Sequence, residues 1–193
     1  MAYKQNGQLI DIRRKVFISH YKDDKDEVEA FIDKFCDVEQ VFIPKVLGAN
    51  DNDDFIKSTN TDYVMSQIRE KYLEDSTVTI VLVGKCTHSR RYVDWELKTS
   101  LRQGSYTPNG VMGIILPSQG TSAFLPPRLA DNWEKGHGNC YARYWVYPST
   151  AKTLHDWIED AFDARTSRAH LIKNSQEMMK YNRNCQVCNI THK

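Results

Sequence analysis

The sequence predicts an α/β domain of the flavodoxin-like, doubly wound type, with a mostly parallel five-stranded sheet and a C-terminal helical tail. Short apolar runs alternate along the chain with segments in which apolar residues recur every three to four positions. The run 77–83 is nearly all β-branched residues or leucine, which is typical of a parallel strand covered on both faces. Strands that alternate with helices imply βαβ units and therefore a parallel sheet.

The strands are expected where short apolar runs are bounded by turn residues. Pro44 makes the second one an edge strand or a short strand, because proline cannot donate to a ladder. Gly84 ends the third strand and Pro117 ends the fourth. The five expected strands are 15–20, 38–46, 77–83, 111–116 and 143–147.

The helices are expected where apolar residues form one face. Asp23 and Asp24 lie in the first turn of the first helix, where carboxylates complement the helix dipole. Asp62 and Ser89 are the expected N-caps of the second and third helices. The four expected helices begin at about 23, run from 62 to about 73, run from 89 to 104, and cover 154–162.

The domain boundaries follow from shifts in composition. Gly, Ser, Pro and Asn accumulate between the fourth and fifth strands, which predicts a long loop, and the last segment is too polar for a second core. We expect an N-terminal extension (1–14), one domain (15–162) with a loop insertion (117–142), a polar loop at 48–61, and a partly helical tail (163–193).

Charge and composition exclude several classes of protein. Lys and Arg number 26 against 25 Asp and Glu, so the net charge produces no electrostatic field that would favour binding to nucleic acid or to a membrane. The N-terminus lacks the apolar core of a signal peptide, and no apolar run has the length of a membrane span. Five cysteines are an odd number without a disulfide-like spacing. We therefore expect a soluble cytoplasmic protein.

Familiar nucleotide motifs are missing from the sequence. No G-x-G-x-x-G follows a strand, and there is no P-loop. Asp23 and Asp24 are similar to the acidic pair of a response-regulator receiver, but a receiver needs an aspartate where this chain has Val83 and Gly84. These three classes of site are excluded.

The segment 89–98 is the most informative one for function. Arg90 and Arg91 lie in the first turn of a helix, where positive charge is unfavourable because it is next to the positive end of the helix dipole. An unfavourable placement of this kind often marks a functional site. Together with the helix amides they would attract a phosphate or pyrophosphate. The alternative, that both arginines are solvated or paired with carboxylates, is equally compatible with the sequence.

Glu96 follows Tyr92 by four residues and lies beside the apolar stripe that contains Val93 and Leu97. We therefore expect a half-buried carboxylate between core and cleft, able to stabilise positive charge on a reacting sugar. A glutamate on a helix is more often a solvated surface residue. A carboxylate that points into solvent, or that is packed against the core with no cavity beside it, would not support an enzyme. Only the prediction of the fold would then remain.

Three segments, 16–24, 77–84 and 89–96, resemble the first strand, the third strand and the catalytic helix of TIR domains. The resemblance extends over roughly 15–162 and is greatest to the TIR-like group of the Thoeris anti-phage systems. It implies an enzyme that cleaves NAD at the nicotinamide bond and makes an ADP-ribose-derived signal for a partner effector protein. NAD is then the substrate, no other cofactor is implied, and self-association is expected.

The resemblance also implies a set of site residues. Glu96 matches the catalytic glutamate. TIR domains often have Ser-Tyr or Ser-Phe where this chain has Ser19, His20 and Tyr21, which shifts the expected pocket by up to one residue. The residues implied to contact substrate are Phe17, Ser19, His20, Tyr21, Cys86, Thr87, Arg90, Arg91, Tyr92 and Trp95.

Other interpretations compete with this one. The protein could be a non-catalytic TIR-like scaffold, since a fold alone does not establish activity. Cys185, Cys188 and His192 have part of a zinc-ligand spacing, with a fourth ligand needed from a residue such as His170 or Cys140. Incidental thiols are the favoured explanation, so no metal is expected. His20 and His88 could carry protons, but hydrogen-bonding roles in a pocket wall are favoured.

Overall fold

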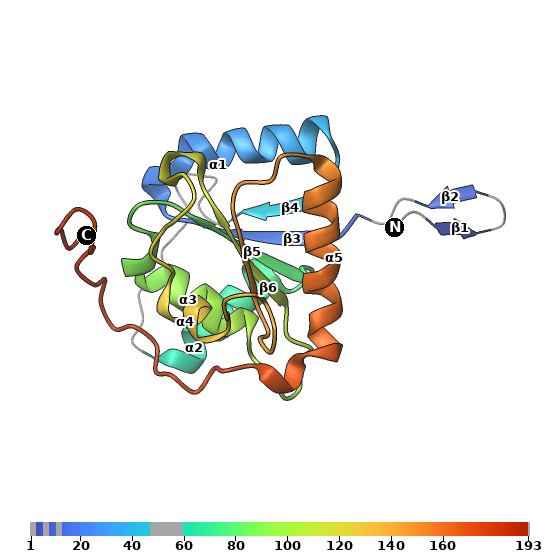
Figure 1. Cartoon of the computed structure of the whole chain (residues 1–193). Coiled ribbons are helices and arrows are strands. Elements are labelled where there is room, and N and C mark those ends of the chain that lie inside the picture. Colours follow the sequence, from blue (N-terminus) through green and yellow to red (C-terminus); the bar gives the residue numbers. More distant parts are fainter. Residues whose placement is uncertain (1–2, 6–7, 11–12, 47–59, 193) are drawn as a thin grey trace.

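The computed structural model describes residues 3–5, 8–10, 13–46 and 60–192, and most of the expected 48–61 loop lies outside them. Its centre is an all-parallel five-stranded sheet in the order β4-β3-β5-β6-β7 (Figure 1). A separate antiparallel pair, β1 (Tyr3–Gln5) and β2 (Gln8–Ile10), precedes it. The sheet strands are β3 (Lys15–Ser19), β4 (Ile43–Val46), β5 (Val78–Val83), β6 (Gly110–Ile115) and β7 (Arg143–Trp145).

The helices alternate with these strands as expected for a doubly wound sheet. Short 3₁₀ or π segments flank most of them, at 22–24, 33–38, 69–73, 87–89, 117–119 and 169–171. The α-helices are α1 (Lys25–Ile32), α2 (Thr61–Ile68), α3 (Arg91–Ser100), α4 (Pro127–Asp131) and α5 (Ala151–Ser167). None of the described helices is long and apolar enough to cross a bilayer.

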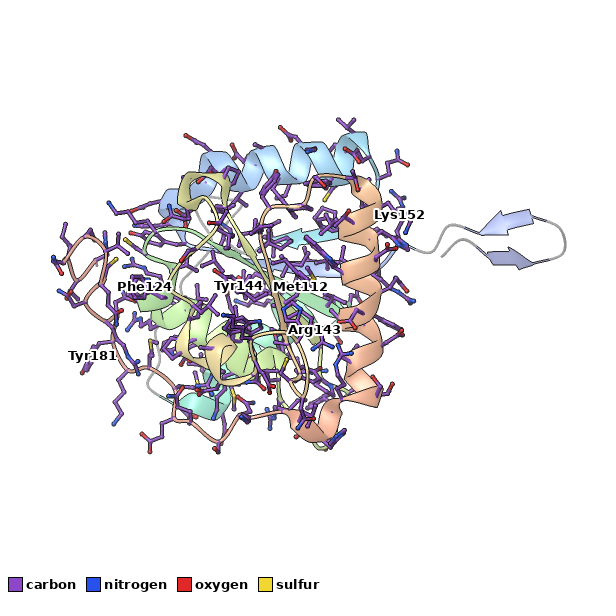
Figure 2. All side chains as sticks on the ribbon, in the orientation of Figure 1. Met112, Phe124, Arg143, Tyr144, Lys152 and Tyr181 are labelled. Carbon is purple, nitrogen blue, oxygen red and sulfur yellow. The ribbon has the colours of Figure 1, made fainter. Side chains whose placement is uncertain are left out.

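Apolar side chains on the two faces of the sheet form separate cores. On one face, Ile18, Ile80 and Met112 pack with residues of α1 and α5. Figure 1 shows the two helices, and Figure 2 labels Met112. On the other face, strand residues such as Val81 pack with α3 and α4, and Phe17 packs with α2. Because both faces are covered, the strands carry continuous apolar runs, and the predicted fold class is confirmed.

The strand order places a topological switch point beside the first strand of the sheet. β3 pairs with β4 on one side and with β5 on the other, both in parallel. The chain therefore leaves β3 and β5 at the same edge of the sheet, where ligands bind in open α/β folds. The segments that follow Ser19 and Val83 meet at this edge.

Two predicted caps are wrong. Asn60, not Asp62, caps α2, because its side-chain oxygen accepts a hydrogen bond from the Tyr63 amide. Ser89 belongs to a 3₁₀ turn, and Arg90 is the residue that precedes the first turn of α3. The Ser89 hydroxyl donates instead to the Cys86 carbonyl and stabilises that turn.

The C-terminal third also departs from expectation. The segment 117–142 contains a 3₁₀ turn and α4 and is not simply a loop. Helix α5 continues to Ser167, past the expected boundary at 162, and no helix is found in the described residues 172–192. The tail is therefore partly helical, as expected, and its helical part ends at Leu171. The following segment runs along α4 and α3 and forms hydrogen bonds with Arg128 and Lys98 (Figure 1).

Candidate functional site at the carboxyl edge of the sheet

Glu96 and Ser19 form the polar centre of this edge. Ser19 ends β3, and its hydroxyl donates a hydrogen bond of 2.5 Å to Oε2 of Glu96 on α3. Ser19 is fully buried and Glu96 is 3 % exposed, so the expected half-buried carboxylate is in fact enclosed. The helix register brings Glu96 to the sheet because Val93 and Leu97 on the same helix pack against the strands.

The enclosure changes the charge of the glutamate. Burial raises the pKa of Glu96 to about 8, and the Ser19 hydrogen bond only partly opposes this shift. The carboxyl is therefore mainly protonated at neutral pH as it stands. Two hollows on the described surface lie elsewhere: one adjoins Gln40 and His155, the other Phe124 and Val187, and neither borders Glu96.

Tyr21 and Arg90 form a second polar group beside this pair. The Arg90 guanidinium lies 3.8 Å from the centre of the Tyr21 ring, an attractive cation–π arrangement. The Tyr21 hydroxyl donates to Asp23 at 2.5 Å. Both Tyr21 and Arg90 are buried, with 6 % of each exposed. The structure thus brings together two of the residues predicted to contact substrate, and it places the arginine on an aromatic ring.

Thr87 links the loops that follow β3 and β5. Its hydroxyl oxygen accepts a hydrogen bond from the Gly84 amide and donates to Asp24. Burial raises the pKa of Asp24 to about 6, with Thr87 opposing the shift. A Cβ at Gly84 would overlap the Asp24 carboxyl, so the close approach needs glycine. In the sequence, Asp24 was considered as a helix-dipole residue and as part of a receiver-like acidic pair, and neither interpretation predicts this contact.

The two histidines of this region differ in exposure: His88 is buried and His20 is partly buried. His88 is buried, its Nε2 accepts a hydrogen bond from the Gln186 amide, and its ring lies 5.3 Å from that of Phe124. Burial lowers the pKa of both His20 and His88, so each is neutral near pH 7. For His88, the hydrogen-bonding role favoured by the sequence is confirmed.

Three of the predicted substrate contacts are aromatic residues that belong to a core cluster. Phe17 is fully buried beside Trp95, and the Tyr92 ring packs against Trp95 at 5.0 Å. The Trp95 indole donates to the carbonyl of Met179 on the tail. None of these three rings lines either of the two hollows described above.

The tail contacts α3 along its length. The Arg91 amide donates to the Asn182 side chain, and the Arg91 guanidinium reaches the carbonyl of Lys180. Arg128 of α4 is fully buried, pairs with Asp94 and also donates to carbonyls of the tail. These contacts leave no periodic pattern in the sequence, because they join polar groups far apart in the chain.

Four metal-binding side chains gather beside Tyr21. Cys86, Cys185, Cys188 and His192 have ligand atoms that all lie within 4.8 Å of one another. The fourth side chain of the group is therefore Cys86, whereas the sequence suggested a residue such as His170 or Cys140. Burial raises the pKa of the Cys86 thiol. For Cys185, burial is outweighed by its hydrogen bonds with the Cys86 side chain and with the amides of Cys188 and Val187, which lower its pKa.

Comparison with protein families agrees with this geometry. The model of the TIR-like domain of the Thoeris protein ThsB matches residues 17–121, more than half of the chain. The chain belongs to this family. A comparison with curated proteins finds no match.

The part of the chain that matches the Thoeris TIR-like domain includes the whole Glu96 site. It begins within β3, contains Ser19, Cys86 and α3, and ends before α4. Helix α5 and the tail with Cys185, Cys188 and His192 lie outside the match. The family assignment therefore supports a defence-related TIR-like protein.

Proposed function

We propose that this Thoeris TIR-like protein cleaves NAD and that Glu96 supplies the catalytic carboxylate. The observation that carries the proposal is the enclosed Glu96–Ser19 pair at the switch point of the sheet, in a chain of this family. Packing alone does not require a glutamate there, since burying a carboxyl lowers stability unless it is hydrogen-bonded. Perturbed carboxyl groups of this kind are typical of functional sites.

The proposed reaction breaks the bond between C1′ of the ribose and the nicotinamide nitrogen. The bonding electron pair leaves with nicotinamide, which departs neutral and needs no proton, and the positive charge passes to the ribose. A carboxylate held in a site of low dielectric constant stabilises that charge more than water does. Attack by water gives ADP-ribose and a proton, whereas attack by a hydroxyl group gives a cyclic or conjugated product.

The other residues at this edge have supporting roles in the proposal. Ser19 orients Glu96 through its hydrogen bond, so it is a positioning residue. Arg90 and Arg91 at the start of α3 would hold the pyrophosphate, and Tyr21 would pack on a ring of the substrate. For this to happen, Arg91 exchanges its contact with the Lys180 carbonyl for substrate.

Activity in this proposal depends on opening of the site. Glu96 is enclosed and mainly protonated as the structure stands, so substrate must displace neighbouring side chains before it reaches the carboxyl. Opening also admits water, which lowers the pKa of Glu96 and produces the carboxylate. We therefore expect a resting protein of low activity that a trigger or self-assembly activates.

The same enclosure is the observation that favours a second function, a non-catalytic TIR-like scaffold. A glutamate that is 3 % exposed and that neither of the two hollows adjoins can serve as a buried structural group. Such a protein would act through association with its own copies or with other proteins. The carboxyl edge of its sheet would then bind no substrate.

The two functions differ in whether nicotinamide is released. The purified protein, alone and with an extract of phage-infected cells, is incubated with NAD, and nicotinamide is followed by chromatography. The enzyme proposal predicts release in at least one condition and its loss in Glu96→Gln. Self-association without release in either condition would establish the scaffold instead.

A further inference from the structure

A cluster of thiols and imidazole joins the C-terminal tail to the loop after β5. The Sγ atoms of Cys86 and Cys185 are 3.1 Å apart, and those of Cys86 and Cys188 are 3.6 Å apart. Nε2 of His192 lies 3.1 Å from Sγ of Cys188. Cys86 is separated from the other three by about a hundred residues of sequence, so the fold itself assembles the group.

We propose that Cys86, Cys185, Cys188 and His192 bind a structural zinc ion. Three thiolates and one imidazole make a closed tetrahedral site, one of the usual compositions of structural zinc sites. Zn–S bonds of about 2.3 Å place sulfur atoms of a tetrahedron roughly 3.8 Å apart. The thiols are already close to this spacing, and all four ligand atoms lie within 4.8 Å of one another. Small rotations of the side chains complete the tetrahedron.

The surroundings of the cluster orient two of its ligands. Nδ1 of His192 lies 3.3 Å from the Tyr21 hydroxyl, which itself donates to Asp23. This arrangement suits a histidine that donates through Nδ1 and leaves Nε2 for a metal, as second-shell partners commonly do. The backbone amides of Val187 and Cys188 form hydrogen bonds with the side chain of Cys185 and so fix its position in the Cys-x-x-Cys turn.

Two backbone hydrogen bonds close the turn that carries Cys185 and Cys188. The Asn189 amide donates to the Cys185 carbonyl, and the Cys185 amide donates to the Ile190 carbonyl. Asn189 adopts a positive φ of 58°, a conformation that asparagine tolerates better than most residues. The backbone thereby reverses direction and brings His192 back to Cys188.

A metal explains why a polar tail is held here. Residues 172–192 contain no helix or strand, and only Met179 and Cys185 among their apolar residues are buried. A segment of that length loses much conformational entropy when it is ordered. Zinc would fix its far end beside Tyr21, while Arg128 and Lys98 hold its first part. The zinc proposal does not depend on NAD cleavage.

The test is the metal content and cobalt spectrum of the full-length protein, purified under reducing conditions. We expect stoichiometric zinc and, after exchange for Co²⁺, the visible bands of tetrahedral cobalt with thiolate charge transfer. Cys188→Ser should lose stoichiometric zinc and weaken these bands. Tyr21→Phe should keep all four ligands and bind zinc roughly 10–100-fold more weakly.

Cys140→Ser is the matched control, because Cys140 is buried but lies outside the cluster and should leave zinc content unchanged. Chelation of the wild type should also make residues 172–192 sensitive to protease while the rest of the domain stays resistant. A metal-free wild type that gains no cobalt bands would overturn the proposal. So would a disulfide between two of the three thiols in freshly purified protein, detected by mass spectrometry.

Discussion

Glu96 and Ser19 form a buried, hydrogen-bonded polar pair between α3 and β3. The Ser19 hydroxyl satisfies one carboxyl oxygen, and burial keeps the carboxyl protonated up to a pH of about 8. A protonated carboxyl in a closed site and a carboxylate in an open one differ in charge by one unit. Access of water to Glu96 is therefore enough to change the chemistry of the site.

The raised pKa predicts how stability varies with pH. The stabilising effect of protonated Glu96 is fully present below about pH 4.5 and is lost as the pH rises through about 8, because the unfolded chain releases its proton first. Glu96→Gln lacks this dependence. Between pH 5 and 8.5 the variant should gain roughly 3–5 kcal/mol in unfolding free energy relative to wild type. Urea unfolding across this range measures the difference, and parallel curves would contradict it.

Helix α3 connects the site to the tail through its buried acidic residue. Asp94 forms a two-pronged ion pair with Arg128 and accepts a hydrogen bond from the Met179 amide. Asp94→Asn leaves a buried guanidinium without its counter-charge, so we expect a loss of about 3–5 kcal/mol in unfolding free energy. Hydrogen exchange at Met179 should accelerate. Asp156→Asn, in an exposed pair, should leave both quantities unchanged.

The contact between β6 and α5 requires a glycine. A Cβ at Gly110 would overlap the carbonyl oxygen of Ala161, and backbone cannot move aside as a side chain can. Gly110→Ala should therefore lower the unfolding free energy by at least about 1–3 kcal/mol. Gly138→Ala is the control, because its Cβ would meet only the flexible end of Glu134. Equal urea midpoints for the two variants would refute this assignment of close packing.

At the scale of the whole molecule, the elements that pack into the core could be predicted from sequence. The strand at 77–83 is a continuous run of β-branched residues and leucine, and the helix around Leu154 has a strong helical period. Both patterns follow from burial in the core. The placement of Glu96 on the inner face of α3 followed from the same spacing. Its complete enclosure did not, because enclosure depends on residues distant in sequence.

The tail shows why the rest could not be predicted. Its contacts with Trp95, Arg91 and Arg128 use backbone carbonyls and amides, which every sequence offers. The metal-binding spacing of Cys185 and Cys188 was visible, but the third thiol, Cys86, comes from the loop after β5. Only the fold reveals which of the remaining cysteines completes the group.

The most direct measurement of the central claim is the rate of nicotinamide release from NAD by Glu96→Gln under conditions in which the wild type is active. The substitution keeps the shape of the side chain and removes its charge. We predict a rate at least about 10²–10³-fold below that of wild type, the effect of losing one stabilising group at a reacting centre. Glu134→Gln, at an exposed position, should match the wild type. Undiminished release by Glu96→Gln would contradict the account.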